Sequence, residues 1–374
     1  MTSALARNWR VSWRSTGVFI FGAIAVVLTV SALLLKVAGY DATLALGALW
    51  KGSLGSSYAL FSATLVRATP LILAGLAVAL AFRAGVFNIG VEGQLLAGAA
   101  VATIVGSKLS STMGLLTLPT ELMAGALAGA GWAGIASWLR SRFRVLEVIS
   151  TIMLNFVALH GVGYLVRGPL QEPLRIYPQS DVLPNVGLIP KLIPGTRLHW
   201  GFIAAIAAAV VFWWILRHTA AGFRLRASGA NPHAARSAGL IHVGRVTALA
   251  FLVSGALAGL AGTVELTGVT FALYENISPG YGYTAIAVAL LARLDPLGII
   301  ATGLFFGALE AGAGAMQRDA GVPAAFVSVV EAAVVLAVIA FDAVRNSSCA
   351  LHEAHTESTA PHSLSSASSS ASVT

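Results

Sequence analysis

Charged residues are scarce in this chain of 374 residues. Asp, Glu, Lys and Arg together make up 10% of it, whereas soluble domains contain about 25%. Hydrophobic residues reach 57%, and the mean hydropathy is +0.82. So few charges cannot cover the surface of a soluble protein, which excludes a soluble enzyme, a coiled coil and a disordered regulator. The composition predicts an all-α, polytopic membrane helix bundle.

Motifs for catalysis and metal binding are also missing. No segment has the form GxxxxGK[ST] of a phosphate-binding loop, so the chain does not hydrolyse ATP itself. The 8 histidines lack the spacing of metal ligands, and neither a metal site nor a cofactor is predicted. Ser254-Gly255 lacks the preceding glycine of a GxSG protease motif, which makes a membrane enzyme a poor hypothesis. The single cysteine, Cys349, excludes an intrachain disulfide.

Long apolar runs occupy most of the chain and predict ten transmembrane helices, since a span needs about 20 residues. They lie at 17–35, 68–82, 91–106, 121–139, 147–166, 201–216, 246–264, 283–293, 297–316 and 324–341. The run 283–293 is too short to cross unaided and is expected to begin earlier, in a broken or tilted segment. The Gly- and Ser-rich stretch 41–62 is expected to lie at the membrane interface.

Basic residues indicate the orientation. The formal net charge of +8 by itself allows nucleic-acid binding. The arginines, however, gather before the first run and in the loops 140–146 and 217–245. They are Arg7, Arg10 and Arg14, then Arg140, Arg142 and Arg144, then Arg217, Arg224, Arg226, Arg236 and Arg245. With ten spans and a cytoplasmic N-terminus, all three groups lie inside, as the positive-inside rule requires. We therefore expect a multi-pass membrane protein with both termini cytoplasmic and no nucleic-acid partner.

The chain divides into three parts. Residues 1–16 form a cytoplasmic N-terminal segment, and 17–341 form the transmembrane domain. Residues 342–374 become rich in Ser, Ala and Thr, and such a composition buries too little apolar surface to offset its ordering entropy. We expect this part to be a disordered cytoplasmic tail. Pairs of glycines four residues apart predict close helix packing within the transmembrane domain. They are Gly125 with Gly129, Gly255 with Gly259, and Gly303 with Gly307.

Polar residues interrupt the apolar pattern between 82 and 94. Asn88, Glu92 and Gln94 stand there among three glycines. A broken helix inside the membrane would explain them, because intramembrane carboxylates usually face a cavity or a partner. A short cytoplasmic turn, with Glu92 as an ordinary acid at a helix start, explains them equally well.

A second segment resembles the first. Asn276-Ile277-Ser278 stands before an apolar run, as Asn88-Ile89-Gly90 does. In the ten-span topology the first run leaves the cytoplasm and the second enters it. The resemblance between the two segments therefore predicts an inverted repeat, as in many transporters.

The loop 217–245 contains a short helix. Asn231 is a good N-cap, Pro232 suits the first turn, and Gly239 can end the helix. A short rigid helix between two spans suits the docking of a soluble partner, although a loop that merely caps itself would look the same.

Three motifs together resemble those of a known family. They are Phe87-Asn88-Ile89-Gly90-Val91-Glu92-Gly93-Gln94, then Glu147-Val148-Ile149-Ser150-Thr151-Ile152-Met153-Leu154-Asn155-Phe156 leading to Gly168-Pro169, and Gly229-Ala230-Asn231-Pro232 with Ala234-Ala235 and Gly239. A weaker fourth is Gly282 to Ala289 before Pro296-Leu297-Gly298. The chain resembles, over about residues 65–340, permease subunits of bacterial ABC importers for nucleosides and simple sugars, within the branched-chain amino acid and ribose permease superfamily.

The resemblance implies partners and a role for the short helix. A separate ATPase would supply the nucleotide site, an extracytoplasmic binding protein would deliver the substrate, and a second permease would complete a heterodimer. The helix that docks the ATPase, the coupling helix, would comprise Gly229, Asn231, Pro232, Ala234, Ala235 and Gly239.

Two polar sets are expected to line the substrate path, namely Asn88, Glu92 and Gln94 in one half and Asn276, Tyr281 and Tyr283 in the other. Asn and Gln offer donors and acceptors to hydroxyls and base edges, and tyrosine can stack on a base. The alternative is that Asn88 and Glu92 hold a broken helix together, with Arg83 as an ion-pair partner.

Two rival functions stay open. Glu92, Glu310 and Glu331 would serve an ion-coupled secondary transporter, because intramembrane acids often form proton relays. A permease of the same superfamily for ribose-like sugars or branched-chain amino acids is the other rival.

Overall fold

The computed structural model describes residues 31–239 and 241–323, together with Thr29 and a few separate positions between 325 and 333. Nearly all of them belong to one compact unit, Ser31–Glu331. The segment 1–16, most of the runs 17–35 and 324–341, and the tail 342–374 lie outside the described residues. The three-part division of the chain therefore remains a prediction.

Helices follow one another along this unit, and the described residues contain no β-strand, only two isolated bridges. The helices are α2 (Ala42–Ser53), α3 (Ser57–Ala59), α4 (Leu65–Arg83), α5 (Val91–Met113), α6 (Thr117–Phe143), α7 (Glu147–Arg167), α8 (Gly201–His218), α9 (Ala220–Ala230), α10 (Pro232–Ser237), α11 (Val243–Glu265), α12 (Tyr281–Leu291) and α13 (Pro296–Ala320). Every predicted run between 68 and 316 corresponds to one of them. The prediction of a helical membrane bundle is confirmed.

Six of the described helical segments are long and apolar enough to cross a membrane. They are Ser57–Arg83, Gly114–Phe143, Glu147–Arg167, Gly201–His218, Val243–Thr270 and Pro296–Ala320. Helix α12 has only 11 residues, about 17 Å against a hydrocarbon core of about 30 Å. The expectation that this run is too short to cross unaided is therefore confirmed, whereas the total of ten spans remains a prediction.

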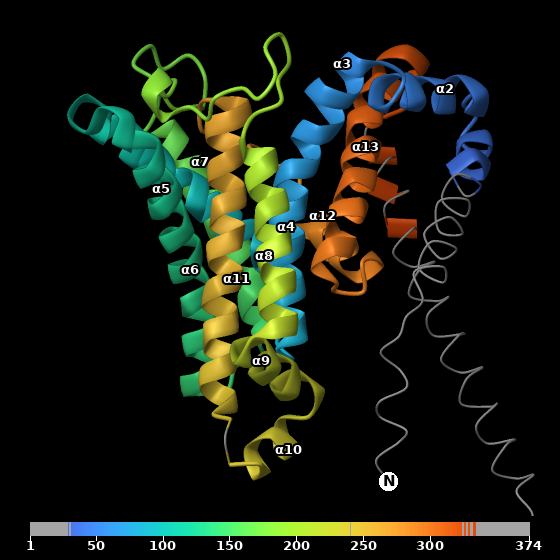
Figure 1. The fold of residues 1–374 in the computed structure, drawn as a ribbon. Helices are drawn as coiled ribbons and strands as arrows, with labels where there is room; N and C mark the ends of the chain where they lie inside the picture. The colour runs from blue at the N-terminus through green and yellow to red at the C-terminus, as the bar shows by residue number, and fades with distance from the viewer. Residues whose placement is uncertain are drawn as a thin grey trace, which may run out of the picture. The chain divides into compact units, whose positions relative to one another are not determined.

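Helix α4 lies at the centre of the unit and is buried along most of its length. It packs on α11, α12 and α13, and Figure 1 shows α4 and α11 running from residues 168–200 at one end towards α9 and α10 at the other. We call these the loop end and the α10 end. Helices α6 and α8 and the first half of α7 expose large apolar side chains, as lipid-facing helices do.

Glycines set the contact between α6 and α11. A Cβ at Gly129 would overlap the carbonyl of Gly255, and one at Gly259 would overlap the carbonyl of Gly125. Gly307 lies against Ala68 in the same way. The paired glycines thus allow backbones to approach closely, which confirms the packing role expected from their spacing.

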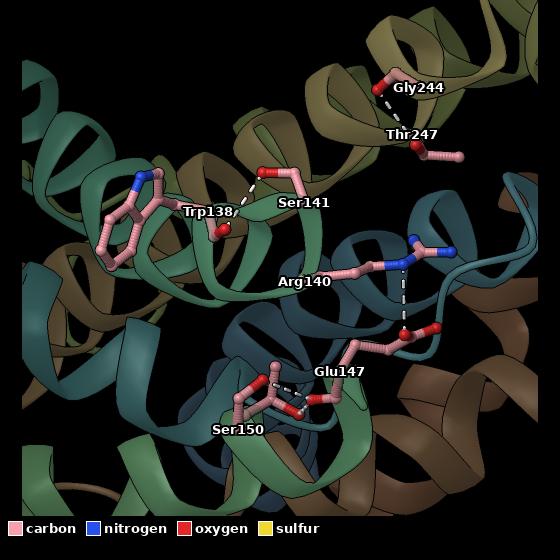
Figure 2. A network of polar contacts seen from close by, with 8 residues as sticks. Trp138, Arg140, Ser141, Glu147, Ser150, Gly244 and Thr247 are labelled. Atoms are coloured by element: carbon pink, nitrogen blue, oxygen red, sulfur yellow. Dashed lines mark hydrogen bonds and ion pairs between the residues drawn. The ribbon is translucent and has the colours of Figure 1, made fainter. Parts of the chain in front are cut away.

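The connection between α6 and α7 lies at the α10 end. Helix α6 extends to Phe143, so Arg140 and Arg142 belong to its last turn, where the helix dipole favours cations. The connection predicted at 140–146 is therefore shorter than expected. Arg140 Nε lies 3.2 Å from Glu147 Oε2 at the start of α7, and Figure 2 shows this ion pair beside the first turn of α11.

The segment 168–200 covers the loop end of α11. The backbone amides of Ser180 and Leu183 donate to the carbonyls of Leu273 and Phe271, at 2.7 and 2.8 Å. His199 is buried against Gly268, and burial lowers the pKa of its ring to about 4. The imidazole ring of His199 is therefore neutral, and its packing against Gly268 holds the segment 168–200 on the bundle.

Candidate functional site

The connection between α4 and α5 runs back into the bundle. The chain turns at Gly85, which has a φ of +75°. Asn88 Nδ2 then donates to Ser254 Oγ at 2.9 Å, and Ser254 Oγ donates to the carbonyl of Ala77 at 2.6 Å. Ala77 lies six residues before the end of α4 at Arg83, which is about 9 Å along the helix. Helix α5 therefore begins inside the bundle, as the broken-helix interpretation expected and the surface-turn interpretation did not.

Asn88 and Gln94 form a closed amide pair. Asn88 Nδ2 donates to Gln94 Oε1 at 2.9 Å, and Gln94 Nε2 donates to Asn88 Oδ1 at 3.0 Å. The same Oδ1 accepts the amide of Gly90 at 3.0 Å. Both side chains are buried. Most of their hydrogen-bonding capacity is therefore used to hold the helix break.

Asn155 of α7 caps the start of α5. Its Oδ1 accepts the amide of Gly93 at 2.8 Å, and its Nδ2 donates to the carbonyl of Ile89 at 2.9 Å. Helix starts leave such amides without intrahelical partners. Neither Asn155 nor Ser254 was among the predicted site residues. The sequence signal that could have found them is a polar residue in the middle of an apolar run.

Glu92 joins α5 to α12. Its Oε2 accepts the amide of Gly282 at 2.6 Å, and its carboxylate also bonds to the Ser278 hydroxyl. Gly282 lies so close that a Cβ there would overlap the backbone of Glu92. The N-terminal ends of two helices therefore meet at this carboxylate, which suits the positive ends of both dipoles.

Arg83 does not pair with Glu92 as expected. Its Nη2 lies 4.0 Å from Asp295 Oδ1, the N-cap of α13, at the α10 end. The reason is that α5 begins deeper in the bundle than the last turn of α4, so the two side chains lie at different levels. The backbone amide of Gly282 and the hydroxyl of Ser278 stabilise Glu92 in place of a cation.

The second predicted set is only partly brought together. Tyr281 is buried at the start of α12, and Tyr283 is 47% exposed. The hydroxyl of Tyr283 lies 3.4 Å from Asn155 Nδ2 and so reaches the network around Asn88 and Glu92. The side chain of Asn276 is exposed and takes no part in the described hydrogen bonds of that network.

The short helix predicted at the α10 end is present as α10. Asn231 Oδ1 accepts the amides of His233 and Ala234, each at 3.0 Å. Pro232 begins the helix and Gly239 follows it with a φ of +73°. Ala234 and Ala238 are exposed, whereas Ala235 is buried within this chain. The outward face of α10 therefore presents the small side chains of Ala234 and Ala238, and Ala235 is not part of it.

Helix α9 connects α10 to the helix break. A Cβ at Gly229 would overlap the carbonyl of Arg83, and Gly229 also contacts Gly85. Three residues after Gly85 the chain reaches Asn88. A displacement of α9 and α10 would therefore act directly on the segment that leads into the polar network.

Titratable side chains outside this network are scattered over the described residues. Within the described ranges no cluster of three or more His, Cys, Asp or Glu side chains has metal-binding geometry. Glu310 is partly buried in α13, and Glu331 falls outside the described residues.

The architecture defines a multi-pass membrane protein in which two interrupted helices meet inside the bundle, an arrangement typical of transporters. Over residues 60–339 the chain matches the protein family described as "Branched-chain amino acid transport system / permease component". The chain belongs to this family. It is thus a membrane permease component and not the subunit that hydrolyses ATP.

Several relatives are similar over most of their length. The guanosine ABC transporter permease protein of Bacillus subtilis is 39% identical over 328 residues, covering 86% of this chain and 93% of the relative. The glucose ABC transporter permease protein of Haloferax volcanii is 38% identical and covers 88% of both chains. The nucleoside ABC transporter permease protein of Lactococcus lactis is 33% identical, covering 81% of this chain and 85% of the relative.

The closed amide pair generates a prediction about stability. Asn88→Ala leaves the buried Gln94 amide and the Gly90 N–H without partners, and each such group costs about 1–3 kcal/mol. We expect a lower melting temperature of the purified protein in detergent, whereas Asn276→Ala, which removes an exposed side chain, should leave it unchanged. A normal melting temperature together with altered substrate preference for Asn88→Ala would show that Asn88 lines the path instead.

Proposed function

We propose that this permease forms the translocation path for nucleosides or related simple sugars in an ATP-driven importer. The observation that supports this most is the meeting of α5 and α12 at the Glu92–Gly282 contact, because interrupted helices at the centre of a bundle are how transporters present polar groups to a substrate. The names of the relatives support the substrate class. The missing phosphate loop supports a separate ATPase.

The two predicted polar sets take different roles in this proposal. Asn88, Gln94 and Glu92 hold the helix break, since their hydrogen bonds go to other groups of the chain. Tyr283, exposed beside Asn155, and the exposed Asn276 line the path. Neutral polar and aromatic groups suit weak binding, which is enough when an extracytoplasmic binding protein supplies the affinity.

The inverted repeat is part of the same proposal. The connection between α4 and α5 turns at the α10 end, where Gly85 contacts Gly229. The connection between α11 and α12 turns at the loop end, where the carbonyl of Leu273 accepts the amide of Ser180. The two helix pairs thus run in opposite directions and meet at Glu92 and Gly282, as halves related by a two-fold axis would.

An importer of this kind needs an ATPase, a second permease and a binding protein. Helix α10 is the docking element for the ATPase in this proposal, and the second permease and the binding protein complete the complex. Arg140 and Arg142, at the α10 end, support a cytoplasmic position for this end by the positive-inside rule. With ten spans, both termini are then cytoplasmic.

The single cysteine offers a test of this topology. Cys349 lies in the tail that we expect in the cytoplasm, so a membrane-impermeant maleimide should label it only after the cells are permeabilised. A cysteine introduced at Tyr177, in the segment 168–200, should be labelled in intact cells and serves as the control. Labelling of Cys349 in intact cells would overturn the even number of spans.

Transport of labelled substrates tests the function itself. Cells or vesicles that contain this chain with its ATPase, second permease and binding protein should take up guanosine or glucose. Replacing the phosphate-loop lysine of the ATPase should abolish this uptake. Ribose and leucine are measured in parallel to test the rival substrates. Uptake that persists without the ATPase and collapses with a proton ionophore would favour an ion-coupled transporter instead.

A charge on the outward face of α10 tests the docking role. Ala234→Glu would place an unpaired carboxylate in the interface with the ATPase, which is strongly unfavourable. We expect uptake to fall to background while the membrane subunits still assemble. Ala235 is unsuitable because a charge there would disturb this chain itself, whereas Ala221→Glu, on the exposed start of α9, is the matched control. Normal uptake by Ala234→Glu with the ATPase bound would exclude α10 as the docking helix.

A further inference from the structure

A pocket of about 270 Å³ lies near the loop end of α7, away from the amide network. It is lined by His160, Gly163, Tyr164, Arg167, Gly168 and Glu275. All but the last two belong to one face of α7, because they recur every three or four residues. Glu275 comes from the segment that leads into α12. The pocket therefore lies between α7 and the second helix break.

An ion pair closes one side of this pocket. Arg167 Nη2 lies 2.6 Å from Glu275 Oε2. Glu275 comes this close because Gly163 has no side chain, since even a Cβ there would lie 3.2 Å from Glu275 Oε1. The pair is partly exposed, with 62% of the Arg167 side chain and 36% of the Glu275 side chain accessible. Both partners therefore keep donor and acceptor capacity for a third molecule.

The polar face of α7 is poorly suited to contact with lipid. His160 lies seven residues before the end of α7 at Arg167, which places it about 10 Å inside the span. Tyr164, one turn further along, is 72% exposed. Polar and ionisable residues at such depth normally face a bundle interior or a water-filled cavity. This face is therefore expected to border an aqueous space in the assembled transporter.

Helix α7 also contacts the residues at the helix break. Tyr283 of α12 is exposed, and its hydroxyl lies 3.4 Å from Asn155 Nδ2 on α7. Asn155 caps the start of α5, next to Glu92. Helix α7 thus lines the pocket with His160 and, five residues earlier, reaches the point where α5 and α12 meet with Asn155.

We propose that this pocket is an outer binding site for the substrate and that it takes a nucleoside. The inference rests on the proposed function and adds the residues and the class of substrate. Tyr164 would stack on the base, as aromatic side chains do with nucleic-acid bases. Glu275 would accept, and Arg167 would donate, hydrogen bonds to the ribose hydroxyls. The volume is close to the lower end of ligand pockets, about 300 Å³, which suits one uncharged nucleoside.

Two substitutions test the two halves of the site in the reconstituted transporter. Tyr164→Ala should raise the KM for guanosine about tenfold or more through the loss of stacking, with a smaller change for glucose, and Tyr164→Phe should restore the wild-type KM. Glu275→Gln should reduce the preference for guanosine over 2′-deoxyguanosine. Tyr58→Ala removes another exposed tyrosine, on α3, and should leave both measurements unchanged.

The outcomes separate this site from the proposed function. Guanosine uptake by the wild type with an unchanged KM in Tyr164→Ala would overturn the site and leave the function standing. Failure of Tyr164→Ala to co-purify with the second permease would show that this face is a subunit contact, which also overturns the site. Absence of both nucleoside and sugar uptake by the wild type would overturn the proposed function, and this inference with it.

Discussion

The structure depends on one constraint, that a helix beginning inside a membrane must find acceptors for its first amides within the protein. Glu92 and Asn155 supply them. Glu92 accepts the amide of Gly282 at the start of α12, and Asn155 accepts that of Gly93 at the start of α5. The two acceptors come from α5 and α7, so each interrupted helix is completed by another element. Three helices are thereby tied together at the centre of the bundle.

Glycine makes this arrangement geometrically possible. Gly282 lies so close to the backbone of Glu92 that a Cβ would overlap it, and Gly93 lies close to Asn155, where a Cβ would be tight. The same device holds α6 against α11 through Gly129 and Gly259. Because lipid offers no hydrophobic drive for helix association, close backbone contact replaces it. The helix breaks around Glu92 and Asn155 are consequently held by short backbone contacts and few large side chains.

Packing also links the polar network to the α10 end. Gly229 in α9 lies against the carbonyl of Arg83 and against Gly85, and Asn88 follows three residues later. Ala84 and Val86, on either side of Gly85, belong to a buried apolar cluster that Leu225 of α9 joins. A movement of α9 and α10 therefore has a rigid route to the helix break, with no flexible linker between them. This is the physical connection that an importer driven by a separate ATPase requires.

The sequence by itself determined the class of protein, because low charge and long apolar runs leave only a helical membrane bundle. It also determined the start of α10, because the cap at Asn231 depends on only a few neighbouring residues. It also indicated Asn88, Glu92 and Gln94, since polar groups among glycines break the apolar pattern. Only the tertiary structure decided which partners they have. Asn155, far along the chain from Asn88, reaches the same point, and Arg83 lies at another level and pairs with Asp295. Hydrogen-bond partners of this kind depend on how helices distant in sequence pack, and no local pattern encodes that.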